Sequence, residues 1–249
     1  MSYFDFDNKR IFYTIEGTGK PLLLLHGNTA SSKMFDPIVT LFENRTVIRM
    51  DFLGCGQSDR IDIWPIDLWY YWSEQAAALL TNLGFAQVDV IGCSGGALAA
   101  LNLSLEHPKL VNSVAADSFE GIEADASITE QIRVGRSYAK QMESFRMILE
   151  MMHGEDWEQV IDADTEAVVS HAENVGNFFH RSLSELKTKL MLTGSAEDEM
   201  FSEGHYERLF DRISGTVNHC CVHIFSNGGH PALISNINEY IRIYEEFAI

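Results

Sequence analysis

The sequence is poor in basic residues. Its 249 residues include 18 Lys and Arg against 36 Asp and Glu, which gives a formal net charge of −18 at pH 7. A surface this acidic repels nucleic-acid phosphates and anionic lipid headgroups. We therefore expect neither a nucleic acid nor a membrane as a partner.

Cysteines are also few, and their spacing suits neither a metal site nor a disulfide framework. Cys220 and Cys221 are adjacent, whereas Cys55 and Cys93 lie far from them and from each other. No pair has the spacing of metal ligands, and a chain of this length does not need disulfides for stability. We expect reduced thiols, a cytoplasmic location and no bound metal.

Long apolar runs are missing as well. No stretch approaches the roughly 18 consecutive apolar residues of a transmembrane helix. Residues 1–10 contain acidic side chains and no apolar run, unlike a secretory signal peptide. Hydrophobic residues nevertheless make up 46% of the chain, which is enough for a sizeable buried core.

Short apolar runs alternate with helical patterns along most of the chain. The expected strands are 11–16, 21–25, 46–50, 88–91, 110–116, 190–193 and 222–225, and the expected helices are 68–83, 97–105 and 234–247. The unbroken apolar run 21–25 is typical of a strand buried on both faces of a parallel sheet. This alternation predicts an α/β fold with a mostly parallel central sheet and helices on both faces.

One segment interrupts the alternation. Residues 119–184 contain no convincing strand, and they show helical patterns over 128–152 and 164–183 that are rich in aromatic residues and methionine. A segment of this length favours a helical lid over the carboxyl edge of the sheet, inserted into a core made of residues 1–118 and 185–249. An ordinary pair of crossover helices is the alternative.

A glycine-rich turn carries the candidate nucleophile. Gly92-Cys93-Ser94-Gly95-Gly96 fits the pattern G-x-S-x-G and lies between an apolar strand and an Ala-rich helix. Such a strand-to-helix turn holds the serine in a strained backbone conformation, with its hydroxyl exposed above the sheet. Ser94 is therefore the predicted nucleophile.

A serine needs a base, and the base needs a carboxylate to orient it. His230 follows the last expected strand and is the predicted base; a histidine that caps the final helix is the alternative. The loop after strand 190–193 offers Asp198, our first choice for the acid, and Glu197. Asp117, at the end of the preceding expected strand, is the third candidate.

Two backbone N–H groups are expected to bind the oxyanion of the reaction. Gly95 follows the nucleophile and begins a helix, where the first N–H groups have no partner within the helix. The second group should come from Asn28, in the loop after strand 21–25. In the same loop, His26 is expected to shape the backbone rather than act as a base.

These motifs, in this order, resemble the α/β-hydrolase family, and the resemblance covers nearly the whole chain outside residues 119–184. The stretch 51–58 is similar to the family's D-x-x-G-x-G-x-S loop, which shapes the pocket. The resemblance implies the order serine, acid, histidine, a variable lid and no cofactor. The family's usual G-x-x-D acid loop would place the acid at Glu197, so the choice between Glu197 and Asp198 stays open.

The predicted function is that of a serine hydrolase, which cleaves a small carboxylic ester through an acyl-enzyme intermediate. The aromatic residues and methionines of the predicted lid favour a small-molecule substrate with an apolar portion. A carbon–carbon bond hydrolase, a thioesterase, a lactonase and a peptidase would use the same machinery. A non-catalytic receptor that binds a small ligand in the pocket is the alternative of another class. The sequence carries no signal for the oligomeric state.

Overall fold

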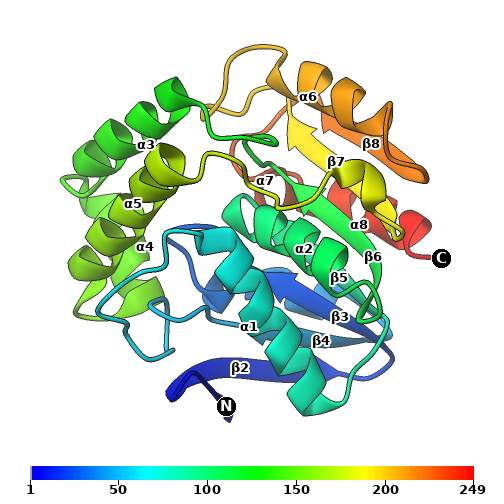
Figure 1. Cartoon of the computed structure of the whole chain (residues 1–249), viewed down its shortest axis with the longest axis horizontal. Helices are drawn as coiled ribbons and strands as arrows, with labels where there is room; N and C mark the ends of the chain where they lie inside the picture. Colours follow the sequence, from blue (N-terminus) through cyan, green and yellow to red (C-terminus); the bar gives the residue numbers. More distant parts are fainter. Residues whose placement is uncertain (1) are drawn as a thin grey trace.

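The structure is a computed structural model that describes residues 2–249. Within them, eight strands form one sheet in the order β1-β2-β4-β3-β5-β6-β7-β8 (Figure 1). The strands are β1 (Ser2–Phe6), β2 (Lys9–Gly17), β3 (Lys20–Leu25), β4 (Arg45–Met50), β5 (Val88–Cys93), β6 (Val111–Asp117), β7 (Lys189–Ser195) and β8 (Cys220–Phe225). Strand β2 pairs antiparallel with β1 and β4, and the other pairings are parallel. The expected mostly parallel α/β sheet is confirmed.

Helices cover both faces of this sheet, because the central strands are apolar on both sides. In β3, Leu23 and Leu25 face one core, which helices α1 (Leu68–Leu83) and α2 (Gly95–Glu106) complete. Leu22 and Leu24 point to the other core, which includes side chains of α8 (Ile237–Phe247). The period of two along the strand thus divides its leucines between the two layers.

The first strand is absent from the sequence expectations. Only Phe4 of β1 is buried, so the strand lacks the apolar run that identifies its neighbours. Asp7 and Asn8, with φ of 50° and 62°, form the tight turn that joins β1 to β2. Two consecutive positive φ values suit a two-residue hairpin turn, in which Asp and Asn are tolerated.

Three α-helices, α3 (Ala126–Ala139), α4 (Glu143–His153) and α5 (Trp157–Asn174), lie in residues 119–184. They gather beyond the carboxyl ends of the central strands (Figure 1). The structure divides the helical pattern over 128–152 at residues 140–142, which allows α3 and α4 each to pack on α5. The helix expected over 164–183 instead starts at Trp157 and ends at Asn174, just before Gly176 with φ 77°.

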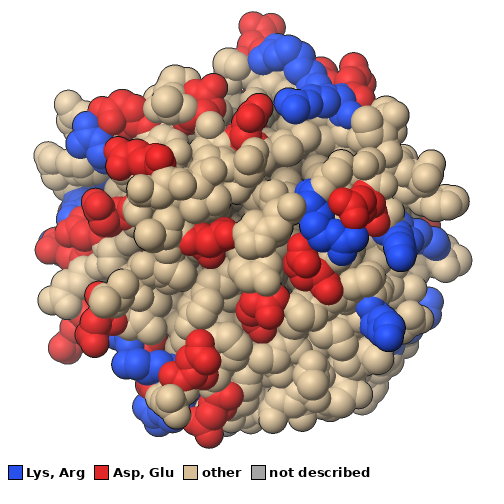
Figure 2. All heavy atoms as spheres, viewed as in Figure 1, with Lys and Arg blue, Asp and Glu red and all other residues tan. Residues whose placement is uncertain are grey.

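Acidic side chains are spread over the face shown in Figure 2 rather than gathered in one patch. All four cysteines are unpaired, and two of them, Cys55 and Cys93, are buried. Within residues 2–249, no helix combines the length and the apolarity that crossing a membrane requires.

Candidate active site

Ser94 occupies the turn between β5 and α2 in a strained conformation. Its φ of 53° and ψ of −124° form a combination that glycine adopts readily and other residues avoid. A Cβ on Gly92 would lie 2.2 Å from the carbonyl oxygen of Gly96, and a Cβ on Gly96 would lie 2.2 Å from that of Leu25. The glycines therefore let strand and helix approach closely, and this approach presents the Ser94 hydroxyl above the sheet.

His230 and Asp198 lie together at the same edge of the sheet. His230 Nδ1 is 2.9 Å from Asp198 Oδ2, and the Asp198 side chain is only 2% exposed. Asp198 also accepts hydrogen bonds from the Tyr206 hydroxyl at 2.6 Å and the Met200 N–H at 2.9 Å. Burial alone would raise the pKa of Asp198, but the bonds from His230 and Tyr206 outweigh it and lower the pKa. An ionised Asp198 accepts a hydrogen bond from the Nδ1–H group, which leaves Nε2 of His230 free to act as a base.

The other two candidates for the acid have different surroundings. Glu197 is exposed to solvent. Asp117 is buried and accepts hydrogen bonds from Thr193 Oγ1 at 2.6 Å and from the Leu233 N–H at 3.0 Å. Burial raises the pKa of Asp117 to about 6 despite these bonds. Of the three carboxylates, the structure therefore brings Asp198 into hydrogen-bond contact with His230.

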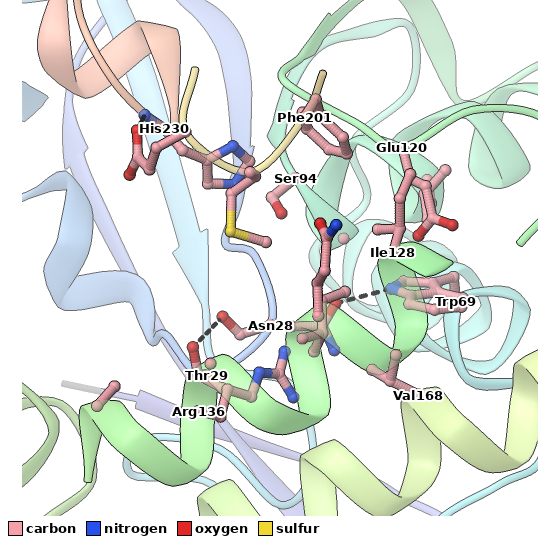
Figure 3. Close-up of a pocket in the computed structure, with 18 of the residues that line it drawn as sticks. Asn28, Thr29, Trp69, Ser94, Glu120, Ile128, Arg136, Val168, Phe201 and His230 are labelled. Carbon is pink, nitrogen blue, oxygen red and sulfur yellow. Dashed lines mark hydrogen bonds between the residues drawn. The ribbon is translucent and has the colours of Figure 1, made fainter. Parts of the chain in front are cut away.

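The two expected oxyanion residues face each other beside Ser94. A Cβ on Gly95 would lie 2.0 Å from Asn28 Oδ1 and 2.6 Å from Trp69 Nε1, so only glycine fits at this position. The Asn28 side chain accepts a hydrogen bond from Trp69 Nε1 at 3.0 Å (Figure 3). His26 is fully buried, and its Nε2 accepts the Phe52 N–H at 3.1 Å. Through that bond His26 holds the backbone in place, which is the structural role expected of it.

A buried carboxylate, which the sequence analysis missed, ties this loop to α5. Asp164 is 0% exposed and accepts hydrogen bonds from Asn28 Nδ2 at 3.1 and 3.0 Å and from the Thr29 N–H at 3.3 Å. Arg136 Nη1, on α3, lies 2.7 Å from the same carboxylate. No spacing pattern in the sequence indicates this cluster, because its members are separated by up to 136 residues.

His153, the last residue of α4, holds the same loop from another side. Its Nδ1 accepts the Gly56 N–H at 3.0 Å, and its Nε2 donates to the carbonyl oxygen of Thr29 at 3.0 Å. Burial lowers the pKa of His153, which favours the neutral ring that these two bonds require. Helices α4 and α5 thus position the loop that carries Asn28.

Replacing Asp164 with alanine should lower the free energy of unfolding by about 3–5 kcal/mol, because it leaves Arg136 without its buried partner. The matched control is Asp162→Ala on the same helix. Asp162 is 66% exposed and pairs with Lys140, so its loss should cost no more than about 1 kcal/mol. Urea denaturation measures both variants, and equal effects would show that the buried cluster contributes no special stability.

A cavity of about 470 Å³ lies beside the candidate nucleophile and the candidate base. Ser94, Gly95, Asn28 and His230 line it, and Figure 3 shows the His230 ring beside Ser94 at one side of the space. Much of the remaining lining is apolar and comes from the helical segment and from the loop after β7: Ile128, Ile132, Ala139, Phe145, Val168, Met200 and Phe201. Within residues 2–249, no group of three His, Cys, Asp or Glu side chains is arranged to hold a metal ion.

Residues 20–147 match the family model for the alpha/beta hydrolase fold. The chain therefore belongs to the α/β-hydrolase family, a family of hydrolases.

Two curated relatives match nearly the whole chain. A 2-hydroxymuconate semialdehyde hydrolase of Pseudomonas putida is 23% identical and covers 93% of this chain and 88% of its own length. The serine hydrolase BPHL of Mus musculus is 25% identical and covers 95% and 82%. Among solved structures, the enol-lactonase from Burkholderia xenovorans superposes with a TM-score of 0.77 at 15% identity and covers 99% of both chains. That likeness shows a shared fold.

Proposed function

We propose that the protein is a serine hydrolase that cleaves a small carboxylic ester. The observation that supports this most is the cavity shared by Ser94 and His230, together with the 2.9 Å hydrogen bond between His230 and the buried Asp198. In this proposal, the helical segment 119–184 is the lid, which supplies apolar lining for a small-molecule substrate.

The proposed mechanism follows from these positions. His230 Nε2 takes the proton of the Ser94 hydroxyl as the oxygen attacks the carbonyl carbon, and Asp198 stabilises the resulting imidazolium. The N–H groups of Asn28 and Gly95 bind the oxyanion; each such donor is typically worth about 10²–10³ in rate. His230 then protonates the leaving alcohol, and a water molecule, activated by the same histidine, releases the acid.

The proposal predicts hydrolysis of p-nitrophenyl acetate, butyrate and octanoate by the wild-type protein. We expect kcat/KM to rise by about fourfold for each methylene that enters the apolar lining, at roughly 0.8 kcal/mol per buried CH₂. The chain length at which the increase stops measures the acyl side of the cavity. No release of p-nitrophenol from any of the esters by the folded protein would contradict an esterase.

A carbon–carbon bond hydrolase is the second candidate. It is favoured by the Pseudomonas putida relative, whose similarity covers 93% of the chain. 2-Hydroxymuconate semialdehyde, the compound in that relative's name, and the three esters, assayed side by side, distinguish the candidates: cleavage of the semialdehyde with inert esters would favour the second.

A further inference from the structure

Three charged side chains line the cavity in addition to His230, and one of them, Arg136, pairs with a side chain of opposite charge. The charge of Arg136 is balanced by the buried Asp164 at 2.7 Å. Glu199 accepts the backbone N–H of His230 at 3.1 Å, next to the catalytic groups. The third, Glu120, lies in the loop after β6. No basic side chain contributes to the shift in its pKa.

Glu120 is held in place but not neutralised. Its Oε1 accepts one hydrogen bond, from the Asp125 N–H at 2.7 Å. Burial is the main influence on the pKa of Glu120. It outweighs this hydrogen bond and raises the pKa to about 7. Ionising a buried carboxyl group costs free energy unless a cation lies next to it. Since Arg136 and Asp164 cancel, ionised Glu120 leaves the cavity with net negative charge.

The position of Glu120 points to a part of the substrate that does not react. In Figure 3, Glu120 lies beside Ile128, with Ser94 between it and His230. A group that contacts Glu120 would therefore sit away from His230, at the far side of the cavity. An apolar wall next to a single carboxyl group suits an alkyl chain that ends in a positive charge.

We propose that Glu120 binds a cationic nitrogen of the substrate, so that Ser94 preferentially cleaves esters carrying an ammonium group remote from the carbonyl carbon. This inference rests on the proposed esterase function. The charged and titratable groups around Glu120 are Asp125 at the start of α3, His205 at the start of α6 (His205–Ser214), and, across the cavity, Arg136, Glu199 and His230.

The test compares esters of equal shape that differ only in charge. On the acyl side, p-nitrophenyl 6-aminohexanoate is paired with the heptanoate. On the alcohol side, butyrylcholine is paired with 3,3-dimethylbutyl butyrate. At pH 8 we expect kcat/KM to favour the cation in at least one pair by about tenfold, equivalent to roughly 1.4 kcal/mol.

Two variants assign the preference to its residue. Glu120→Gln should bring the ratio of the two kcat/KM values to about one. Glu123→Gln, an identical change at an exposed position, should retain the wild-type ratio. A preference for the neutral ester in both pairs, or a cation preference that survives Glu120→Gln, would overturn the proposal.

The pH dependence gives an independent readout. Glu120 is protonated below about pH 7, so the wild-type ratio should rise between pH 6 and pH 8 and stay flat in Glu120→Gln. Taking the ratio of the two esters cancels any pH dependence that both reactions share. A flat ratio in the wild type would count against the proposal.

Binding of hexylammonium to Ser94→Ala tests the role of Glu120 separately from the proposed esterase function. Trp69 lines the cavity, so its fluorescence can report occupancy without turnover. If no ester is hydrolysed, the proposed function fails, and hexylammonium still decides the role of Glu120. Binding that is weakened by a further Glu120→Gln change supports the subsite, and binding that is unaffected overturns it.

Discussion

Replacing Ser94 with alanine should reduce kcat/KM for p-nitrophenyl butyrate by about 10⁴-fold or more, because no other group can form the acyl-enzyme intermediate. The free energy of unfolding should change by no more than about 0.5 kcal/mol, since alanine keeps the Cβ and the same strained backbone. Initial rates and urea denaturation measure the two effects.

Ser94→Gly is the matched control for this substitution. It should be equally inactive, yet more stable than Ser94→Ala by about 1 kcal/mol, because glycine adopts the φ of 53° and ψ of −124° without strain. Activity of either variant within tenfold of the wild type would mean that the reaction does not pass through Ser94.

The second large effect concerns the acid. Asp198→Asn should lower kcat by about 10⁴-fold, because an amide can no longer accept Nδ1–H as a carboxylate does or stabilise the imidazolium. Glu197→Gln removes the same charge one residue earlier, from an exposed side chain, and should stay within twofold of the wild type. Steady-state kinetics on p-nitrophenyl butyrate compare them. A large loss in Glu197→Gln, with Asp198→Asn little affected, would assign the acid to Glu197.

The positions of Ser94 and His230 could be predicted because topology determines them. Each follows a strand, β5 or β8, and the carboxyl ends of parallel strands meet at one edge of the sheet. Asn28 follows β3 and reaches the same edge for the same reason. Apolar runs therefore contain enough information to place these three side chains near one another.

The acid was harder to predict, because a loop has no periodicity that distinguishes inward from outward positions. Glu197 and Asp198 are adjacent, and both follow β7. What separates them is burial beside Tyr206, whose hydroxyl lies 2.6 Å from Asp198. Tyr206 belongs to α6 (His205–Ser214), a helix that the sequence analysis did not propose.

The cluster around Asp164 could not be predicted from the sequence. Its contacts with Asn28 and Arg136 depend on how α3 and α5 pack over the sheet, and helix packing leaves no local pattern in the chain. Glu120 carried a weak signal, since it follows closely on β6 at the edge where Ser94 emerges. By contrast, the Asp7-Asn8 turn was a readable hairpin signal for β1.

A phosphate triester can trap the covalent bond that Ser94 is proposed to form with the substrate. The wild-type protein is incubated with diethyl p-nitrophenyl phosphate, and the adduct is located by intact-mass and peptide mass spectrometry. We expect one diethylphosphoryl group per chain, on Ser94, with no adduct in Ser94→Ala. An unmodified wild-type protein, or an adduct on another residue that persists in Ser94→Ala, would contradict it.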